Sequence, residues 1–275
     1  MKIALCISGY FSNKNGDNLS NSNYIYDNII NKCDNIDIFI HSFDKDNETK
    51  ILSKYPNTKY YVIEKQIDFI NNTSKENYEY YKEIHRLQPG ECSLQSTLSF
   101  FYSRCKSIKY SLQYSKENNF IYDCIIRCRF DNGVRLKKPF DGYKPDNFIF
   151  NQSLDFRYFY SPYWNQLNAG YNGFWEFSNT TNMEIFSGIY DYIVNNMFLF
   201  NSEYLLSLDK WPDSDINNFE SNIILSKEIS NVKQESYKLI NSYNNHLIEK
   251  FFMIKSNLYN KSKFIDYTNN IEKIY

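Results

Sequence analysis

Short apolar runs, separated by polar and amphipathic segments, open the chain. Residues 3–7, 36–41 and 59–63 are dominated by apolar side chains, as in strands that are buried on both faces of a parallel sheet. Residues 24–33 carry apolar side chains at helical spacing and predict a short helix between the first two strands. Strands that alternate with helices in this way indicate right-handed βαβ units and therefore an α/β fold around a parallel sheet.

A longer helix is predicted after a polar segment at residues 64–90, which we expect to be a loop excursion. Apolar side chains then recur every three or four residues, at Leu94, Leu98, Phe101, Cys105, Ile108 and Leu112. This single stripe predicts a helix that packs against the core. The first turn of the helix would face the top of the sheet, where Gln95 is a candidate for binding a ligand.

The segment from Tyr122 to Asp131 combines a strand pattern with charged residues. Its even-numbered positions are all apolar or aromatic, which predicts a strand, and the same period places Arg127, Arg129 and Asp131 together near the carboxyl end of the strand. Ligands of open α/β sheets bind at this edge. Buried arginines need anionic partners, because an unpaired buried charge costs several kcal/mol. Protein carboxylates and the phosphates of a ligand both remain possible partners.

The second half of the chain predicts further elements and an aromatic-rich loop. The elements, in order, are strands at 148–150 and 173–178, a helix at 180–195, a helix around 222–225, a short strand at 236–241 and a helical tail from residue 243. Residues 155–171 are dense in Tyr, Phe and Trp, with Asp155, Arg157, Trp164 and Asn165 among them, a composition that suits contact with sugars. We expect one domain at residues 1–240 and a C-terminal helical extension at 241–275 that packs on it.

Composition and charge exclude several classes of protein. Aromatic residues make up 19% of the 275 residues, which argues for a folded chain. Lys and Arg total 31 and Asp and Glu total 32, so the basic excess of a general nucleic-acid binder is missing. The six cysteines form no CxxC pair and the three histidines lie far apart, which disfavours a zinc site with paired ligand spacing.

The expected compartment is the cytoplasm. The apolar run at the N-terminus is too short for a signal peptide, and no stretch reaches the roughly 18 apolar residues of a membrane span. The cysteines lie mostly in apolar segments, as in a reduced protein. The tail after residue 243 mixes apolar and lysine side chains, so peripheral contact with the inner face of the membrane is an alternative to docking on the domain.

Five segments, taken in order, resemble GT-A glycosyltransferases of the bacterial and viral capsule or lipopolysaccharide kind. They are residues 2–9, residues 36–43, the Arg127-x-Arg129-x-Asp131 strand, residues 173–193 and residues 220–224. Together they span about residues 1–230. The resemblance implies a Rossmann-like, mostly parallel central sheet with flanking helices. It also implies a nucleotide-sugar donor, a glycan acceptor and a role in surface polysaccharide synthesis.

The resemblance also assigns residues to a nucleotide-sugar site. Ser8, Gly9 and Tyr10 at the end of the first strand would lie near the nucleotide. The other candidate binding residues are His41, Gln95, Arg127, Arg129 and Asp131. Asp131 would stand where the family has its metal-binding Asp-x-Asp, but Arg129 replaces the first Asp of that motif. Two alternatives follow: Asp131 holds Mg²⁺ or Mn²⁺ against the diphosphate, or the arginines neutralise the diphosphate without a metal.

Glycosyl transfer places growing negative charge on the leaving diphosphate, which Arg127, Arg129 or a metal on Asp131 would stabilise. An inverting reaction also needs a general base, for which Asp213, Asp215 and Glu220 are candidates; Glu220 is favoured by its place at the start of a helix. The sequence does not decide between inversion and retention. A non-catalytic module that binds nucleotide sugars or carbohydrates is the alternative function. Other phosphate enzymes and hydrolases are disfavoured, because GxxxxGK[ST], GxGxxG and GxSxG motifs are absent.

Overall fold

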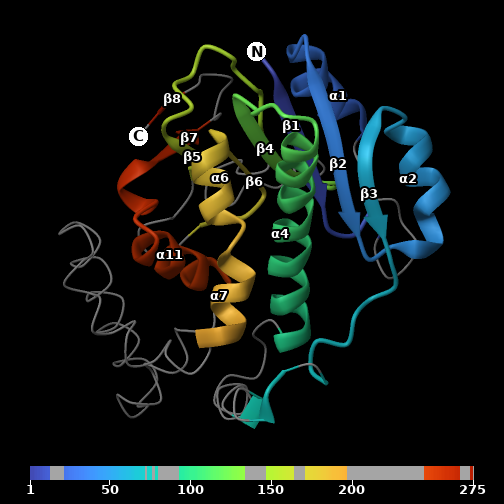
Figure 1. The fold of residues 1–275 in the computed structure, drawn as a ribbon, viewed down its shortest axis with the longest axis vertical. Coiled ribbons are helices and arrows are strands. Elements are labelled where there is room, and N and C mark those ends of the chain that lie inside the picture. The colour runs from blue at the N-terminus through green and yellow to red at the C-terminus, as the bar shows by residue number, and fades with distance from the viewer. Residues whose placement is uncertain are drawn as a thin grey trace.

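A mixed β-sheet with helices on both faces forms the centre of the molecule (Figure 1). The computed structural model describes residues 1–12, 22–71, 73–75, 78–79, 93–133, 147–163, 171–196, 245–266 and 273–274. Within these residues the sheet has eight strands in the order β3-β2-β1-β4-β6-β5-β7-β8. The strands are β1 (Ile3–Ser8), β2 (Ile36–Ser42), β3 (Thr58–Ile63), β4 (Cys124–Arg129), β5 (Phe159–Pro162), β6 (Trp175–Ser178), β7 (Ser262–Asp266) and β8 (Lys273–Ile274).

The first four strands form the parallel half of the sheet, as the sequence predicts. β1 pairs in parallel with β2 on one side and with β4 on the other, and β2 pairs in parallel with β3. The other half is mixed: β6 is antiparallel to both β4 and β5, β7 is parallel to β5, and β8 is antiparallel to β7. The molecule is therefore an α/β fold with a mixed, mostly parallel sheet.

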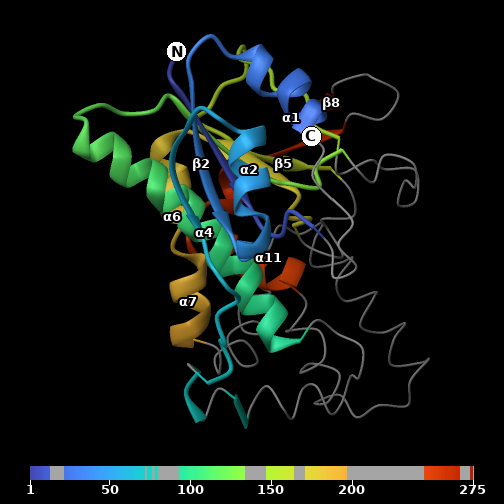
Figure 2. The same ribbon diagram turned by 90° about the vertical axis from the view of Figure 1, so that its right-hand side faces the viewer.

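Alternate side chains of the strands enter two separate cores. Ile3, Leu5 and Ile7 of β1 pack with α1 (Ser22–Asn28) and α2 (Glu48–Lys54) on one face. Ala4 and Cys6 pack on the other face, whose helices are α4 (Leu94–Glu117), α6 (Thr180–Phe186), α7 (Ile189–Asn196) and α11 (Asn245–Lys255). Figure 2 shows α4, α6 and α7 on one side of the sheet and α1 on the other. Three short 3₁₀ helices complete the described elements: η1 (Ile30–Lys32), η2 (Lys45–Asn47) and η5 (Tyr259–Lys261).

α4 confirms the helix predicted from the apolar stripe. Five of the six stripe residues, from Leu94 to Ile108, are buried in the core, and Leu112 is partly buried. The N-cap is Ser93, whose side chain accepts a hydrogen bond from the backbone N–H of Ser96. Because α4 follows a parallel strand, it begins at the carboxyl edge of the sheet and runs back along it. The start of α4 therefore lies at the edge where ligands of such sheets bind.

Five features of the structure differ from the prediction. β3 lies at the edge of the sheet and is mostly exposed, rather than buried on both faces. Residues 148–150 form no strand, because the Phe150 N–H donates to the carbonyl of Asn28 (2.8 Å) rather than to a neighbouring strand. The helix predicted at 180–195 is divided into α6 and α7 at Ser187–Gly188. The tail is helical only through α11 and then returns to the sheet as β7 and β8. The aromatic-rich segment contains the short strand β5, which the sequence did not predict.

α11 docks on the domain through its apolar side chains, because Ile248, Phe251, Phe252 and Met253 are buried in the α4-side core. The suggested membrane contact of the tail therefore gains no support from this helix. None of the helices in the described part of the chain is long and apolar enough to cross a membrane. The predicted elements at 222–225 and 236–241 and the domain boundary at residue 240 lie outside the described residues.

Candidate functional site

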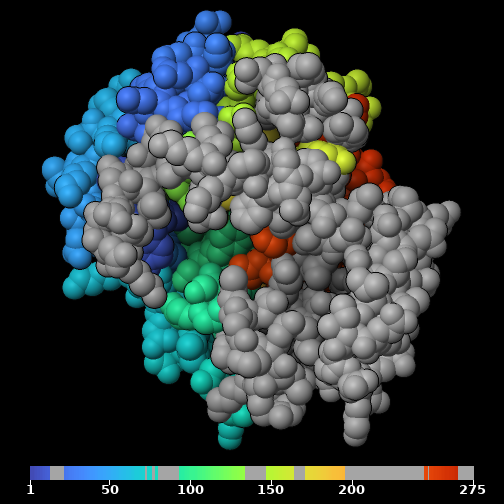
Figure 3. All heavy atoms as spheres, turned by 180° about the vertical axis from the view of Figure 1, so that it is seen from behind, coloured from blue at the N-terminus to red at the C-terminus, as the bar shows by residue number. Residues whose placement is uncertain are grey.

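A pocket of about 900 Å³ lies at the carboxyl ends of β1, β2 and β4 and beside the start of α4. The chain leaves β1 toward β2 and β3 and then returns to the opposite side of β1 as β4. The pocket therefore lies at the point where the strand order reverses, which is the usual ligand site of an open α/β sheet. A hollow at the centre of the face seen in Figure 3 shows green atoms, the colour of residues 93–133.

Six of the eight predicted binding residues line this pocket. They are Ser8, Gly9, Tyr10, Gln95, Arg129 and Asp131. The sequence analysis missed an acidic and amide wall at the end of β2, which consists of Asp44, Asp46 and Asn47 and is joined by Ser12. The signal for this wall was present, since Asp44 lies three residues after the end of the second predicted strand, where a ligand-binding residue of such a sheet would lie.

Gly9 forms the turn that follows β1. Its φ of +106° is a backbone conformation that residues with a side chain rarely adopt. A Cβ atom at this position would meet no atom within 4 Å, so the backbone conformation rather than space requires glycine. The Gly9 N–H donates to Ser103 Oγ (3.1 Å) and to the His41 carbonyl (3.3 Å), while Ser42 Oγ donates to the Gly9 carbonyl (2.8 Å).

Arg127 lies beneath the pocket and has protein partners. Its Nε donates to Ser8 Oγ (3.0 Å), and its Nη1 donates to the Gly173 carbonyl (2.6 Å) and lies 3.4 Å from Glu176 Oε2. Its side chain is only 1% exposed. Of the two kinds of partner that the sequence left open, Arg127 therefore has the protein carboxylate. Among the described residues that line the pocket, its hydrogen-bond partner is Ser8.

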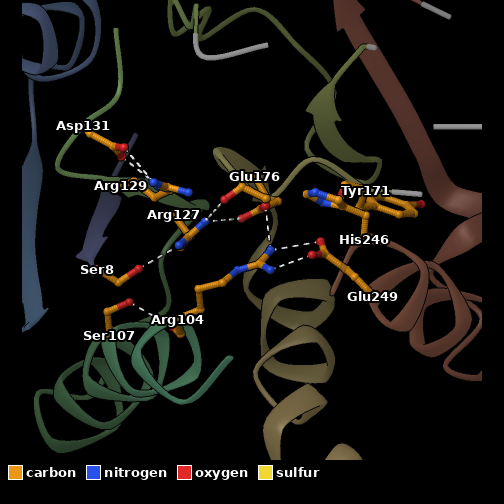
Figure 4. Close-up of polar contacts among 11 residues, drawn as sticks. Ser8, Arg104, Ser107, Arg127, Arg129, Asp131, Tyr171, Glu176, His246 and Glu249 are labelled. Atoms are coloured by element: carbon orange, nitrogen blue, oxygen red, sulfur yellow. Dashed lines mark hydrogen bonds and ion pairs between the residues drawn. The ribbon is translucent and has the colours of Figure 1, made fainter. Parts of the chain in front are cut away.

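A buried ion network surrounds Arg127 (Figure 4). Arg104 of α4 donates through Nη2 to Glu176 of β6 (2.6 Å) and through Nη1 and Nη2 to Glu249 of α11 (2.5 and 2.9 Å). Two guanidinium groups and two carboxylates thus balance each other in a region without solvent contact. Burial raises the pKa of Glu176, and the two arginines oppose that rise. Through Arg127, the network connects α11 with β4, the strand that ends at the pocket.

Arg129 and Asp131 form a bidentate pair at the rim of the pocket. Arg129 Nε donates to Asp131 Oδ1 (2.7 Å) and Nη2 donates to Oδ2 (2.6 Å). The Arg129 side chain is 28% exposed, and its guanidinium also lies over the ring of Phe174. Because Arg129 Nη1 has no hydrogen-bond partner among the described residues, the guanidinium retains donors for a ligand.

Asp131, the residue predicted to hold Mg²⁺ or Mn²⁺, is paired with Arg129 in this structure, and the metal itself stays a prediction. Both carboxylate oxygens of Asp131 accept hydrogen bonds from Arg129, whose positive charge would oppose a second cation. No group of three or more His, Cys, Asp and Glu side chains in the described ranges could hold a metal ion. We therefore assign no step to a metal.

His41 and Gln95 have partners within the protein. The His41 side chain is fully buried behind the pocket, between Ser103 Oγ (2.9 Å from Nδ1) and Glu64 Oε1 (3.1 Å from Nε2). Gln95 lines the pocket, but its side-chain amide accepts from the Phe69 N–H (2.9 Å) and donates to the Ile67 carbonyl (2.6 Å). Gln95 therefore fastens the segment after β3 to α4.

The predicted general bases Asp213, Asp215 and Glu220 lie outside the described residues, as do Trp164 and Asn165 of the aromatic-rich segment. Their proposed roles stay predictions. The described part of the site consequently shows a binding pocket with one partly exposed arginine, and it does not show the group that would remove a proton from an acceptor.

Comparison with known proteins gave no match: no family model, no curated protein and no solved structure was found to be similar to this chain. The fold class and the geometry of the pocket are therefore the observations from which a function is argued.

Proposed function

We propose that this protein is a glycosyltransferase that moves a sugar from a nucleoside-diphosphate donor to a hydroxyl group of a glycan acceptor, in the synthesis of a surface polysaccharide. The observation that carries the proposal is the pocket at the reversal of strand order, with Arg129 at its rim. The resemblance of the Arg127-x-Arg129-x-Asp131 strand to GT-A enzymes adds the reaction class.

The diphosphate of the donor would lie between Arg129 and the start of α4. Arg129 supplies N–H donors in the planar arrangement that suits phosphate oxygens. The start of α4, where Ser93 and Ser96 line the pocket, adds the positive end of a helix dipole. The Gly9 turn leaves open space beside the backbone at the end of β1, so a phosphate group has room to approach it.

The ribose and the sugar need hydroxyl-binding partners, and the pocket contains them. Asp44 and Asp46 at the end of β2 carry carboxylates, which accept hydrogen bonds from pairs of hydroxyl groups. Asp44 is held in place by the Ser12 N–H (2.9 Å), Ser12 Oγ (2.7 Å) and Asn47 Nδ2 (2.9 Å). Tyr10, Phe43 and Phe100 add aromatic surface to the same pocket.

In the proposed reaction the acceptor oxygen forms a bond to the anomeric carbon, the bond between that carbon and the diphosphate oxygen breaks, and negative charge grows on the leaving diphosphate. Arg129 stabilises this charge more strongly in the transition state than in the bound donor, which accelerates the reaction. Asp215 or Glu220 would accept the proton of the acceptor hydroxyl. In this version the reaction proceeds without a metal, because Arg129 occupies the carboxylate that a metal would need.

The test is a thermal-shift screen of nucleoside diphosphates and sugar nucleotides, with and without Mn²⁺, followed by an assay for release of free nucleoside diphosphate with an acceptor library. A specific ligand raises the apparent melting temperature by mass action. We expect a sugar nucleotide to stabilise the protein equally with and without Mn²⁺. Full turnover by the Arg129→Ala protein would contradict the proposed role of Arg129.

A binding module without turnover is the second candidate. The Arg129–Asp131 pair favours it, because both oxygens of the carboxylate nearest the expected leaving group are already engaged. Binding of a sugar nucleotide without release of free nucleotide, with every acceptor tested, would support the module and contradict the enzyme.

A further inference from the structure

A continuous chain of hydrogen bonds links Gly9 at the pocket with Glu64 on the surface. Ser103 Oγ accepts from the Gly9 N–H (3.1 Å), His41 Nδ1 lies 2.9 Å from the same Oγ, and His41 Nε2 lies 3.1 Å from Glu64 Oε1. The His41 side chain is 0% exposed and the Glu64 side chain is 34% exposed. Ser103 is only 2% exposed, and it lines the pocket.

The surroundings of His41 fix which of its nitrogens carries the proton. Its ring packs against Phe43 and Tyr102 at centroid distances of 5.0 and 5.4 Å. This burial, together with Lys106, lowers the pKa of His41 to about 3, so the imidazole is neutral and has one donor and one acceptor. An ionised Glu64 carboxylate only accepts hydrogen bonds. The proton therefore lies on Nε2, and Nδ1 is the acceptor.

This tautomer orients the hydroxyl of Ser103. The hydroxyl has one proton, which it donates to His41 Nδ1, since the alternative acceptor, the His41 carbonyl, is farther away (3.2 Å against 2.9 Å). The lone pairs of Ser103 Oγ then face the Gly9 N–H. All the hydrogen bonds run in one direction, from Gly9 toward Glu64. Successive hydrogen bonds in such a chain strengthen one another in an interior without water.

We propose that Ser103 and His41 are positioning residues that hold the Gly9 peptide in its positive-φ conformation and thereby set the affinity of the pocket for a diphosphate. The link to affinity rests on the function proposed above. Ser103 is not a nucleophile, although Ser, His and Glu are also the residue types of a hydrolytic triad. Its Oγ already accepts from Gly9 and donates to His41, and almost none of its surface is exposed.

The chain offers a matched control one turn along the same helix. Ser107 of α4 is also fully buried, but its Oγ donates to the Arg104 carbonyl of its own helix (2.9 Å). Ser107→Ala therefore removes a buried hydroxyl from α4 without touching Gly9. Ser103→Thr keeps the hydroxyl and serves as the rescue variant. Urea denaturation verifies that each variant is folded before it is compared.

The first measurement is hydrogen exchange of the Gly9 amide by NMR, without any ligand. In Ser103→Ala the Gly9 N–H keeps only its longer bond to the His41 carbonyl (3.3 Å), so Gly9 exchange should speed by roughly five- to tenfold. The rate should be unchanged in Ser107→Ala and close to that of the wild type in Ser103→Thr. The ¹⁵N spectrum of the His41 imidazole should show a protonated Nε2 and an unprotonated Nδ1. Equal Gly9 exchange in the two alanine variants, or a proton on Nδ1, overturns the proposal.

The second measurement is calorimetric titration with uridine, guanosine, cytidine and thymidine diphosphates. For the nucleotide that binds the wild type most tightly, Ser103→Ala should weaken binding by roughly tenfold and Ser107→Ala by less than about twofold. Equal affinities of these two variants would show that the hydrogen bond from Gly9 to Ser103 does not affect nucleotide binding. This result would overturn the positioning role of Ser103 and leave the proposed function standing. Failure of all four nucleotides to bind the wild type contradicts the proposed function itself.

Discussion

The pair of Arg129 and Asp131 determines how an anionic ligand meets the rim of the pocket. Asp131 cancels the charge of Arg129 and adds a carboxylate near the expected position of the diphosphate. Asp131→Asn should therefore strengthen binding of a nucleoside diphosphate by roughly five- to tenfold, because a repulsive charge is removed and Arg129 is released. Calorimetry without added metal measures this change.

The exposed pair of Asp155 and Arg157 was expected to contact sugars, but it is not among the described residues that line the pocket, so it provides the control for that substitution. It has the same bidentate form two residues apart, and the Arg157 side chain is 85% exposed on the surface. Asp155→Asn should leave nucleotide affinity unchanged. If Asp131→Asn instead binds the nucleotide more weakly and Mn²⁺ no longer strengthens that binding, Asp131 is a metal ligand. This result would contradict the proposal of a reaction without a metal.

Gly9 is required for its backbone conformation, so its replacement should act on stability rather than by filling the pocket. Gly9→Ala places a side chain at a φ of +106° while its Cβ meets no atom within 4 Å. We expect the free energy of unfolding to fall by about 1–2 kcal/mol, as measured by urea denaturation. An unchanged free energy of unfolding would mean that this turn carries no strain for alanine.

The individual site residues were predictable only where a strand pattern placed them. The period of two from Tyr122 to Asp131 put Arg129 and Asp131 at the carboxyl end of β4, where they line the pocket. The partners of the arginines were not predictable. Glu176 and Glu249 lie 72 and 145 residues from Arg104 along the chain, and only the folded topology brings these groups together.

At the scale of elements, α11 is fastened to α4 by a buried charge rather than by apolar contacts alone. Glu249→Gln would leave Arg104 and Arg127 with a single carboxylate, Glu176, in a dry interior. Breaking a buried pair in this way typically costs about 3–5 kcal/mol of unfolding free energy, and we expect a loss of this size. Urea denaturation monitored by circular dichroism measures it.

Asp191→Asn is the matched control on the neighbouring helix. Asp191 of α7 also pairs with a cation of α4, Lys109 (2.7 Å), but both side chains are exposed. Exposed pairs contribute little, so the free energy of unfolding should change by less than about 1 kcal/mol. Similar losses in the two variants would contradict the conclusion that the buried network fastens α11.

The predictable elements are those whose pattern is long or continuous. β1 and β2 are continuous apolar runs, β4 has a period of two, and α4, a helix of 24 residues, has an uninterrupted apolar stripe. β5 has four residues and ends in Pro162, and β7 pairs with it across about a hundred residues of chain. Such short strands with distant partners have no local signal, which explains why the tail was predicted as helical throughout.

For the whole molecule, two histidines, the buried His41 and the half-buried His246, make stability depend on pH. Burial lowers the pKa of His41 to about 3 and that of His246 to about 4, from an ordinary value of 6.5. Below about pH 6.5 the unfolded chain therefore binds more protons than the folded protein. The free energy of unfolding should fall with decreasing pH by about 1 kcal/mol per pH unit for each of the two histidines.

His41→Phe tests this dependence, because it removes one of the two groups and keeps a ring of similar shape. Urea denaturation at several pH values between about 6.5 and 5, above the range where most carboxylates titrate, should give a shallower slope for the variant than for the wild type. Identical slopes would show that His41 is not held neutral by the fold.

The central claim, that the pocket at the ends of β1 and β4 binds a sugar nucleotide through Arg129, is tested most directly by one calorimetric comparison. Wild-type protein, Arg129→Gln and Arg157→Gln are titrated with the sugar nucleotide that stabilises the wild type most. Loss of a charge-assisted contact should weaken binding to Arg129→Gln by roughly 10- to 100-fold, while Arg157→Gln should match the wild type. Equal affinities for all three proteins would contradict the claim.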